Sequence, residues 1–542
     1  GRWTLMVSIE EVQAHRPASV KQLIDMQLDR LSPTEQRVLE AASIVGADFS
    51  TSLTAAALEL SDEQVDDTCD SLLRRSLFLR AEPEQRYAFT HALVQEVCLE
   101  RSSPLRRRRW HRRVAEALER DPRAADGAHL LAKHFDAADD PARALPAYLA
   151  AARQAALKHA TSDTIALCAR ALELLPGVTA NRERDLLEFE LLGTMCNQVS
   201  SNSFKATFAG RDAPSVYARA IEIARTLGDV ARSYAAITRW CNYEMIIAAY
   251  ARTGEWLAEL ERIEQENDLD PALLHGGIFA RAFIAFYSGN LATALQLFER
   301  LAPPEHEPSI FHHNLPGRAI ALGHLACARC VAGDSERALE EALSTIRLAE
   351  RLEIPILLAL GHVVRARLRY LRRDRLPGIE AEMLDAVRAA SVDVGLLTEA
   401  RIFALWAEAQ RSPVALSVFQ PLLDTLRHRL TEVSTGSTLI GGALIGALRI
   451  SGHVAEACEL TDEIIAFARA QEHIYLPELL TIRGEQLEQT HPDLAARDYQ
   501  ESIDLARATG ARGLEQRARD RWAAVTNGLD ARPRQRPSAT SD

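Results

Sequence analysis

The sequence predicts an all-α protein, most of it an array of helical repeats. Of its 542 residues only 26 are glycine and 22 are proline, fewer than in an average protein. Alanine, leucine, arginine and glutamate, which favour helices, are abundant throughout. Hydrophobic residues make up 47% and charged residues 25%, which is close to the average for folded domains and excludes extensive low complexity.

Charge and cysteine usage narrow the class of protein further. A net charge of −12 argues against a generally basic surface for nucleic acid. The eight cysteines have no framework spacing, which suits a reducing compartment. Apolar runs stop well short of 18 residues and no signal peptide is recognisable, so we predict a cytoplasmic protein that does not enter the membrane. The chain starts at Gly1 without a methionine, and we interpret it as part of a longer protein.

Residues 1–105 alternate short helices with strand signals. Trp3, Leu5, Val7 and Ile9 alternate within residues 1–18 and predict an edge strand. The run from Ser32 to Glu35 is a capping box with proline at the first helical position, and Gly46 ends the helix that it starts. Further helices are expected over 52–60 and from Ser61.

A hairpin and a last helix complete this region. LFLR (77–80) and YAFT (87–90) flank a polar turn and predict two paired strands. A helix over 91–102 follows, so residues 19–105 have the element order of a winged-helix domain. Its helix from Ser61 carries five acidic residues and only two arginines at its end, which would repel phosphates, so we do not expect this chain to bind DNA directly.

Residues 106–524 repeat with a step of 37 to 44 residues. The phrases GNLATAL, GDSERAL, RDRLPGI, QRSPVAL, GHVAEAC and THPDLAAR align on Ala294, Ala338, Gly378, Ala415, Ala457 and Ala496. Each phrase marks the turn between two helices of a pair. The step is slightly longer than the 34 residues of a tetratricopeptide repeat, so we predict a tetratricopeptide-like α-solenoid. Residues 525–542 are polar and contain prolines, and we expect them to be disordered.

Such an array predicts where function lies. Each repeat is expected to bury its apolar face only against its neighbours. The resulting curvature leaves a concave surface formed by the first helices of the pairs, and a small-molecule, protein or peptide ligand is expected there. The glycines of LIGGALIGAL (439–448) are expected to allow close helix packing, because their spacing does not match a dinucleotide-binding fingerprint.

Two blocks of the chain carry a resemblance. The run QLDRLSPTEQRVLEAASIVGADFS together with YAFTHALVQEVCLERSSPLRRRRWHRRVAEALE, and the closing repeat over 475–522, resemble the region after the ATPase core in bacterial STAND-type signal-transduction ATPases. The resemblance implies an upstream nucleotide-binding core in the same polypeptide, whose tail would be residues 1–18, with ATP or ADP as its cofactor. It also implies self-association on activation.

The resemblance singles out His91. In related STAND proteins a histidine after the wing contacts the phosphates of bound ADP, and the run Phe89-Thr90-His91-Ala92-Leu93 is similar to that context. A helix N-terminus adds positive potential for an anion. The alternative is that His91 only caps the helix that follows.

The arginine-rich run from Arg106 to Arg113 is a second candidate site. It could bind phosphate with Trp110 interleaved, but it also fits the solvated face of a helix whose apolar stripe includes Leu105 and Val114. We favour the latter interpretation.

A ligand pocket is the third candidate. Trp240, Tyr243, Tyr250 and Trp256 form the most aromatic stretch, and His312 and His313 lie in a proline-rich loop that could fold over the concave face. Aromatic walls with a few polar groups are typical of ligand sites. The spacing of the four aromatic residues equally fits core packing. Cys327 and Cys330 lack the second pair that a zinc site needs, so we predict that they are core residues and that the chain holds no metal.

No catalytic constellation is recognisable. The chain has only four lysines, Lys21, Lys133, Lys158 and Lys205. None follows a glycine, so the phosphate-binding P-loop is missing and the chain by itself is not expected to be an enzyme. The leading hypothesis is therefore the effector-binding region of a STAND-type transcriptional regulator. The alternative is a protein-interaction scaffold without an inducer. A compact aromatic pocket favours the sensor, and a broad charged groove favours the scaffold.

Overall fold

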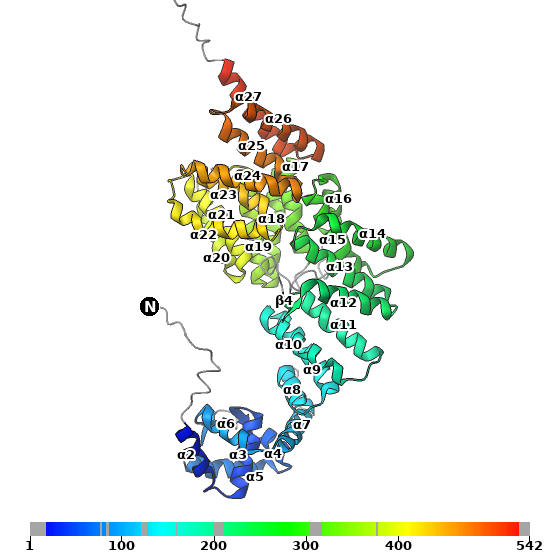
Figure 1. Cartoon of the computed structure of the whole chain (residues 1–542), viewed down its shortest axis with the longest axis vertical. Helices are drawn as coiled ribbons and strands as arrows, with labels where there is room; N and C mark the ends of the chain where they lie inside the picture. Colours follow the sequence, from blue (N-terminus) through cyan, green and yellow to red (C-terminus); the bar gives the residue numbers. More distant parts are fainter. Residues whose placement is uncertain are drawn as a thin grey trace, which may run out of the picture. The chain divides into compact units, whose positions relative to one another are not determined.

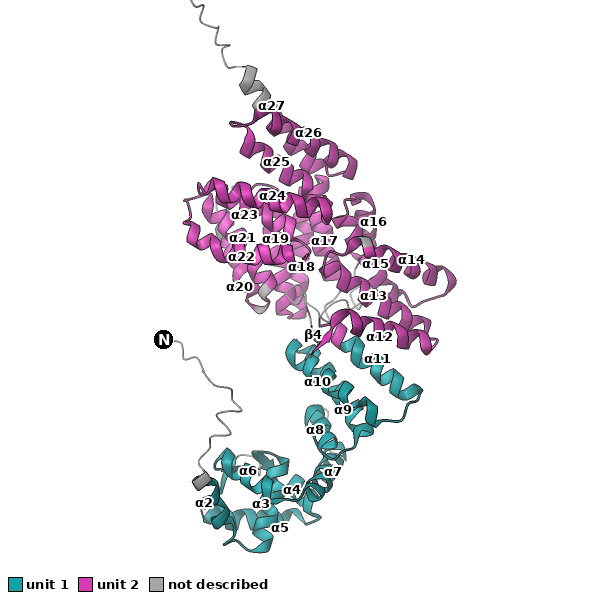
Figure 2. Ribbon diagram, in the orientation of Figure 1, with its two compact units in different colours: residues 1–194 teal, residues 195–542 magenta. Residues whose placement is uncertain are grey.

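The chain is almost wholly helical, with two small antiparallel sheets, as predicted. It divides into two compact units, residues 1–194 and 195–542 (Figure 2).

Among the described residues no helix is both long and apolar enough to cross a membrane. The strand predicted over Trp3–Ile9 lies outside the described part. The computed structural model describes residues 18–530 except 76–77, 83–85, 121–126, 159, 199–206, 209, 304–316 and 375–377.

Unit 1 begins with helices around a three-stranded sheet (Figure 1). The strands are β1 (Asp48–Ser50), β2 (Leu79–Glu82) and β3 (Arg86–Phe89), in the order β1-β3-β2. The predicted hairpin is confirmed, with Leu79 opposite Phe89, whereas the three residues of β1 are too few for a periodic signal. The helices are α2 (Ala18–Leu28), α3 (Pro33–Val45), α4 (Thr51–Leu58), α5 (Asp62–Arg74), α6 (Ala92–Arg101), α7 (Pro104–Arg120), α8 (Ala128–Ala137), α9 (Pro141–Leu157), α10 (Thr161–Leu174) and α11 (Arg182–Cys196), with a 3-10 turn η2 (Leu175–Gly177).

Local sequence signals set the start of α3. Ser32 accepts a hydrogen bond from the Glu35 N–H while the Glu35 carboxylate accepts one from the Ser32 N–H, so the predicted capping box is present. Pro33 occupies the first helical position, where no donor is lost. The core that follows is mainly apolar, with Leu39, Phe49 and Trp110 buried.

Unit 2 consists of helix pairs after a short hairpin of β4 (Thr207–Phe208) and β5 (Arg211–Asp212). Its last helix continues through Asp530. Residues 525–530, the first six of the segment predicted to be disordered, are therefore helical, and residues 531–542 lie outside the described part of the chain. The helices are α12 (Ala213–Thr226), α13 (Val230–Ile246), α14 (Tyr250–Glu266), α15 (Pro271–Tyr287), α16 (Leu291–Leu301), α17 (Gly317–Ala332), α18 (Ser335–Leu352), α19 (Pro355–Leu371), α20 (Ile379–Ala389), α21 (Val394–Ala409), α22 (Leu416–Thr431), α23 (Ser437–Ile450), α24 (Val454–Ala470), α25 (Leu476–Leu487), α26 (Pro492–Thr509) and α27 (Arg512–Asp530), with 3-10 turns η5 (Ala390–Val392) and η6 (His473–Tyr475).

The predicted repeat turns fall between the helices of each pair. Gly289, Gly333 and Gly452 precede α16, α18 and α24 with φ values of 87°, 97° and 88°, a region that only glycine adopts without strain. Ala338 and Ala457 of the same phrases are completely buried. The last phrase is out of phase by one residue, because Ala495 rather than Ala496 is buried there.

The repeats do not contact only their neighbours in the chain, so that expectation was wrong. The loop that leads into the pair α23/α24 contacts the pair α13/α14, which lies five pairs earlier in the chain. Thr435 donates its N–H to the Ile246 carbonyl at 3.1 Å, and its hydroxyl lies 2.7 Å from that of Tyr250, 185 residues away. One pair further along, Phe286 of α15 packs edge-on against Tyr475 of η6, with ring centroids 5.9 Å apart. Successive turns of the superhelix therefore touch along a seam, which we define by Ile246, Tyr250, Thr435 and Glu472.

Glycines allow the tight packing that such a curvature needs. A Cβ on Gly442 would lie 2.7 Å from the Tyr370 hydroxyl, and one on Gly446 would touch the Trp406 ring at 3.5 Å. The expectation for residues 439–448 is thus confirmed. Gly361 of α19 lies against the backbone of α18, since its Cβ would lie 3.2 Å from the Ile346 nitrogen.

A close glycine contact in α25 gives a testable prediction. A Cβ on Gly484 would lie 2.8 Å from the Tyr499 ring, and that ring is completely buried and donates its hydroxyl hydrogen to Glu488. Because the ring is fixed, Gly484→Ala should lower the free energy of unfolding by about 1–3 kcal/mol. Gly254→Ala in α14 is the matched control. No atom of the described residues lies within 4 Å of its Cβ position, and alanine there should raise stability by about 0.5–1 kcal/mol. Urea denaturation of both variants should show changes of opposite sign in the free energy of unfolding.

Candidate functional site

A cavity of about 190 Å³ lies inside the superhelix of unit 2. It is formed mainly by the first helices of the pairs, α13, α15, α17, α19, α21 and α23, which is where the repeat pattern placed the concave face. Aromatic and aliphatic side chains supply most of its wall, and a few polar groups interrupt them. The lining residues are Ile246, Phe283, Tyr287, His324, Leu360, Arg367, Gly395, Leu396, Thr398, Glu399, Arg429, Thr435, Gly436 and Ile440.

An ion pair forms the polar centre of the cavity. Arg367 of α19 donates from Nε and Nη2 to the two carboxylate oxygens of Glu399 of α21, at 2.9 and 2.7 Å. The side chains are only 15% and 13% exposed. Burial lowers the pKa of Arg367, but the charge and hydrogen bonds of Glu399 outweigh it and the pKa lies well above its usual value. The pair is therefore held in its charged form.

Arg429 brings a second guanidinium to the cavity, beside the seam. Its Nη2 donates to the Thr435 carbonyl at 2.8 Å. Burial lowers the pKa of Arg429, opposed by the charges of Glu399 and Glu472.

Glu472 anchors the seam behind Arg429. Its carboxylate accepts hydrogen bonds from the Thr438 hydroxyl at 2.6 Å and the Thr438 N–H at 3.1 Å, and also from the Gly436 N–H. The Tyr250 hydroxyl donates to it at 3.4 Å. Burial raises the pKa of Glu472, opposed by these hydrogen bonds. The loop that carries Thr435 and Gly436 into the cavity wall is therefore held by one buried acid.

His324 contributes a neutral imidazole. Its ring lies between Phe283, Phe279 and Phe298, at centroid distances of 5.1, 5.5 and 5.7 Å. Burial lowers its pKa to about 4, and its Nδ1 lies 2.9 Å from the Ile320 carbonyl. A neutral ring with its proton on Nδ1 donates to that carbonyl, so the charged side chains among the described lining residues are Arg367, Arg429 and Glu399.

The aromatic residues predicted to line a pocket separate into two groups. Trp240 and Tyr243 of α13 and Trp256 of α14 pack with Tyr217 of α12, at ring distances from 5.1 to 6.4 Å. Tyr250 lies elsewhere, stacked on Tyr287 at 5.8 Å. None of the four predicted residues lines the cavity, but Tyr250 contacts Tyr287 and Thr435, which do. His312 and His313 lie outside the described residues.

The sequence pattern did not reveal Arg367, Glu399 and Arg429. One signal was available: Arg367 and Glu399 interrupt the apolar faces of first helices, at positions where the repeat predicts burial. A charged residue at such a position needs a partner. Pairing Arg367 with Glu399, 32 residues apart, nevertheless requires the three-dimensional curvature.

Cys327 and Cys330 are both buried in α17. Among the described residues no group of histidine, cysteine and acidic side chains is arranged to hold a metal ion.

His91 lies at the N-cap of α6, and its Nδ1 accepts a hydrogen bond from the Leu93 N–H at 3.3 Å. The side chain is exposed. Capping is thus the role that the imidazole has within this chain. The same exposed position at a helix N-terminus is compatible with a phosphate contact, which stays a prediction.

The arginine run lies within α7, and several of its arginines form ion pairs within unit 1. Arg106 pairs with Glu40 at 3.0 Å, Arg108 with Asp139 at 3.1 Å, and Arg113 with Glu59 at 2.7 Å. Trp110 is buried rather than displayed for stacking. The run therefore fits the structural interpretation better than a phosphate-binding patch.

A histidine pair beside this run predicts a pH dependence. The Nδ1 atoms of His111 and His134 lie 2.9 Å apart, and burial lowers the pKa of both to about 4. In the unfolded chain a histidine titrates near about 6.5, so the folded state binds fewer protons between these values. Stability is then lost as the pH falls from about 6.5 towards 4.

We expect each of the two histidines to lower the free energy of unfolding of unit 1 by about 2 kcal/mol between pH 7 and 4.5. His134→Gln should remove about half of this pH dependence, because His111 remains, as measured by urea denaturation at the two pH values. His91→Asn is the control, because His91 is exposed and asparagine also caps helices. An unchanged slope in His134→Gln would contradict the assignment.

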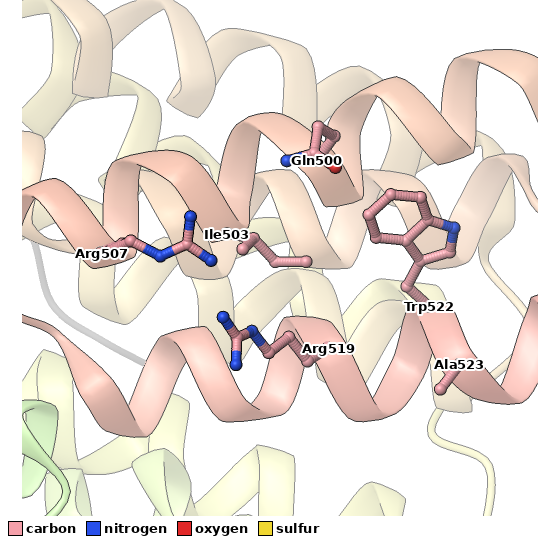
Figure 3. Close-up of a pocket in the computed structure, with 6 residues that line it drawn as sticks. All are labelled: Gln500, Ile503, Arg507, Arg519, Trp522 and Ala523. Atoms are coloured by element: carbon pink, nitrogen blue, oxygen red, sulfur yellow. The ribbon is translucent and has the colours of Figure 1, made fainter.

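A second hollow of about 310 Å³ lies between α26 and α27 (Figure 3). Gln500, Ile503 and Arg507 come from α26, and Arg519, Trp522 and Ala523 come from α27. Both arginines are paired with Glu515, at 3.2 and 2.7 Å, and most of the lining side chains are exposed. This hollow has a larger volume but is more open to solvent, so the cavity inside unit 2 is the better candidate for a small ligand.

Comparison with known proteins gives no sequence-level match: no family model matches the chain, and no curated protein matches it. Solved structures similar to it include a STAND protein with a tetratricopeptide repeat sensor from Pyrococcus horikoshii, at 13% identity and a TM-score of 0.43 over 85% of this chain and 66% of that one. A Rap protein complexed with Competence and Sporulation Factor has 12% identity and a TM-score of 0.44, over 67% of this chain and 98% of that one. The apo form of RapI has 12% identity and a TM-score of 0.38, over 70% and 98%. This chain thus spans about two thirds of the length of the STAND structure.

Proposed function

We propose that this chain is the effector-binding region of a STAND-type ATPase that regulates transcription in bacteria. Unit 2 binds a small-molecule signal in its cavity, and the winged-helix region of unit 1 relays occupancy to an upstream nucleotide-binding core in the same polypeptide. The core binds ATP or ADP, with His91 as a phosphate contact, and this chain itself performs no catalysis. The protein works in the cytoplasm and self-associates on activation.

The observation that carries this proposal is the position of the cavity at the seam. Thr435 and Gly436 line the cavity, and Thr435 also bonds to Ile246 and Tyr250 of the preceding superhelical turn. A ligand that binds one spacing of these turns better than another shifts the array between them, and only such differential affinity can do so. Occupancy is thereby coupled to the curvature of the whole unit.

The alternative is a scaffold that binds a protein or peptide without an inducer. The open hollow between α26 and α27 is the feature that favours it. A compact cavity with Phe283 and Tyr287 in its wall favours the sensor instead, because enclosed, mostly aromatic sites bind small molecules.

The proposal is tested on the longest form of the protein in its source cell. An immunoblot should show a polypeptide well above the 59.9 kDa of this chain, and that protein should hydrolyse ATP at a rate that changes when the small-molecule fraction of a cell extract is added. Leu360→Trp, which fills the cavity, should abolish the change without altering the basal rate. A response that persists in this variant would contradict the sensor, and a polypeptide of about 60 kDa would contradict the upstream core.

A further inference from the structure

The loop between α22 and α23 joins the cavity to the seam. Residues 433–436 of this loop, which we name the latch, precede α23 directly. Thr435 of the latch donates its N–H to the Ile246 carbonyl at 3.1 Å and its hydroxyl hydrogen to the Met245 carbonyl, both at the end of α13. Thr435 and Ile246 also line the cavity. A contact between two superhelical turns is therefore part of the cavity wall.

Backbone strain lies on both sides of the seam. Val433 of the latch has a φ of 54°, in the left-handed region where a branched Cβ is least tolerated. The turns before α13 and α27 instead place Gly228 and Gly510 in this region, with φ values of 65° and 77°. On the opposite side of the seam, Ala248 has a φ of 47° in the turn between α13 and α14. The closed seam thus keeps two non-glycine residues in a conformation that several other turns of the array give to glycine.

The latch also buries an unpaired polar group. Ser434 is completely buried, and its hydroxyl has no hydrogen-bond partner among the described residues. Leaving a buried hydroxyl unpaired costs free energy that water would return if the loop opened. Strained backbone and unsatisfied polar groups persist only where the surroundings hold them, and they cluster at switch regions. The closed latch is therefore held against an opposing free energy.

Polar contacts hold the latch closed. The Glu472 carboxylate accepts a hydrogen bond from the Gly436 N–H. The Tyr250 hydroxyl lies 2.7 Å from the Thr435 hydroxyl and 3.4 Å from the Glu472 carboxylate. Water can replace each of these partners, whereas α23 is buried along most of its length by its own side chains. Release of the latch can therefore occur without unpacking α23.

We propose that the latch is the two-state element through which the cavity acts on the array. In the closed state Thr435 joins the two superhelical turns. In the open state Thr435 leaves α13, Val433 leaves the left-handed region, and the Ser434 hydroxyl reaches water. A ligand against Thr435 and Gly436 favours the closed state, because these residues line the cavity when the latch is closed. The ligand in this account rests on the proposed function, whereas the strained latch does not.

Hydrogen exchange of the full chain without a ligand tests whether the latch opens. The N–H groups of Thr435, Gly436 and Thr438 each donate to an acceptor that the closed latch brings near. Their protection factors, measured by mass spectrometry, therefore report opening of the latch. We expect the three amides to be protected at least about tenfold less than the amides in the middle of α23. Protection equal to that of α23 would show that the latch does not open separately and would overturn the proposal.

Two variants should shift the latch in opposite directions. Val433→Gly relieves the strain of the closed state and should raise the protection of the three amides at least about threefold. Tyr250→Phe removes a hydrogen bond of the closed state and should lower their protection about tenfold. Protection that stays unchanged in either variant, or that falls in Val433→Gly, would overturn the proposal.

Each variant has a matched control in the same unit. Glu353→Gly relieves another left-handed residue, with a φ of 53°, in the turn before α19. Tyr499→Phe removes the hydroxyl of another completely buried tyrosine, which donates to Glu488. Neither control should change the protection of the latch amides. Changes as large as those of Val433→Gly and Tyr250→Phe would assign the effect to the stability of the whole unit and overturn the latch.

The small-molecule fraction of the source cells tests the link between latch and cavity. In a chain that retains a compound from this fraction, the protection of the latch amides should rise at least about threefold. Unchanged protection in such a chain would overturn the link. A chain that retains no compound would contradict the proposed function and leave the strained latch standing, because the exchange measurements on the variants need no ligand.

Discussion

Replacing Glu478 by glutamine is expected to lower the free energy of unfolding of unit 2 by about 3 kcal/mol. Glu478 of α25 is 3% exposed and accepts hydrogen bonds from Arg373, which follows α19, and from Arg517 of α27. Arg517 also donates to the Leu371 carbonyl. One carboxylate thus joins three helices that are distant in sequence. Glutamine keeps the shape of the side chain but leaves the guanidinium groups of Arg373 and Arg517 without the Glu478 charge.

The pH dependence of Glu478→Gln has a definite sign. Burial alone raises the pKa of Glu478, but the charges of Arg517 and Arg373 outweigh it and the pKa is lowered. A lowered pKa contributes stability above the unfolded value near about 4.3, and this stability is lost as the pH falls below it. The gap between wild type and variant in urea denaturation should therefore close in acid.

The control for Glu478 is Asp385→Asn, which breaks the exposed pair with Arg388 in α20. It should cost at most about 0.5 kcal/mol. A Glu478→Gln variant as stable as this control would show that α25 is not held by the buried acid.

Replacing Arg367 by methionine is the second change with a large expected effect, a loss of about 3–5 kcal/mol. The variant leaves the Glu399 carboxylate, 13% exposed, without its guanidinium. The double variant Arg367→Met/Glu399→Leu removes the stranded charge and should recover most of the stability, since apolar replacements of buried pairs are often neutral. Urea denaturation of the four proteins in the cycle measures the coupling.

The matched control for this cycle is the ion pair between Arg427 of α22 and Glu463 of α24. It is bidentate and joins consecutive second helices, as Arg367–Glu399 joins consecutive first helices, but its side chains are 38% and 33% exposed. Arg427→Met should cost no more than about 1 kcal/mol. If the Arg367/Glu399 double variant is as unstable as Arg367→Met alone, the loss comes from packing and not from a stranded charge.

Much of the fold is predictable because its signals are local. The capping box from Ser32 to Glu35 needs only four residues. Gly289, Gly333 and Gly452 each indicate a turn residue with positive φ, whatever the surrounding repeats do. Buried alanines such as Ala338 follow from the spacing of the repeat. These features do not depend on how the repeats stack.

The seam was not predictable, because it depends on the curvature summed over five helix pairs. Thr435 and Tyr250 are 185 residues apart, and no pattern in either segment indicates the other. The same limit applies to the cavity: Arg429 reaches it from the end of α22, a second helix. The aromatic stretch around Trp240 and Tyr243 is a local sequence signal that fits core packing and a ligand pocket equally well. In the structure these two residues pack against Tyr217.

The most direct test of an effector site in unit 2 is retention of a small molecule. The full chain is incubated with the small-molecule fraction of its source cells and separated by gel filtration, and the bound compounds are identified by mass spectrometry. We expect one compound to be retained by wild type in near-equal molar amount, and to be lost from a Leu360→Trp variant with an unchanged melting temperature. Equal retention by both proteins, or no retained compound, would contradict a ligand site in this cavity.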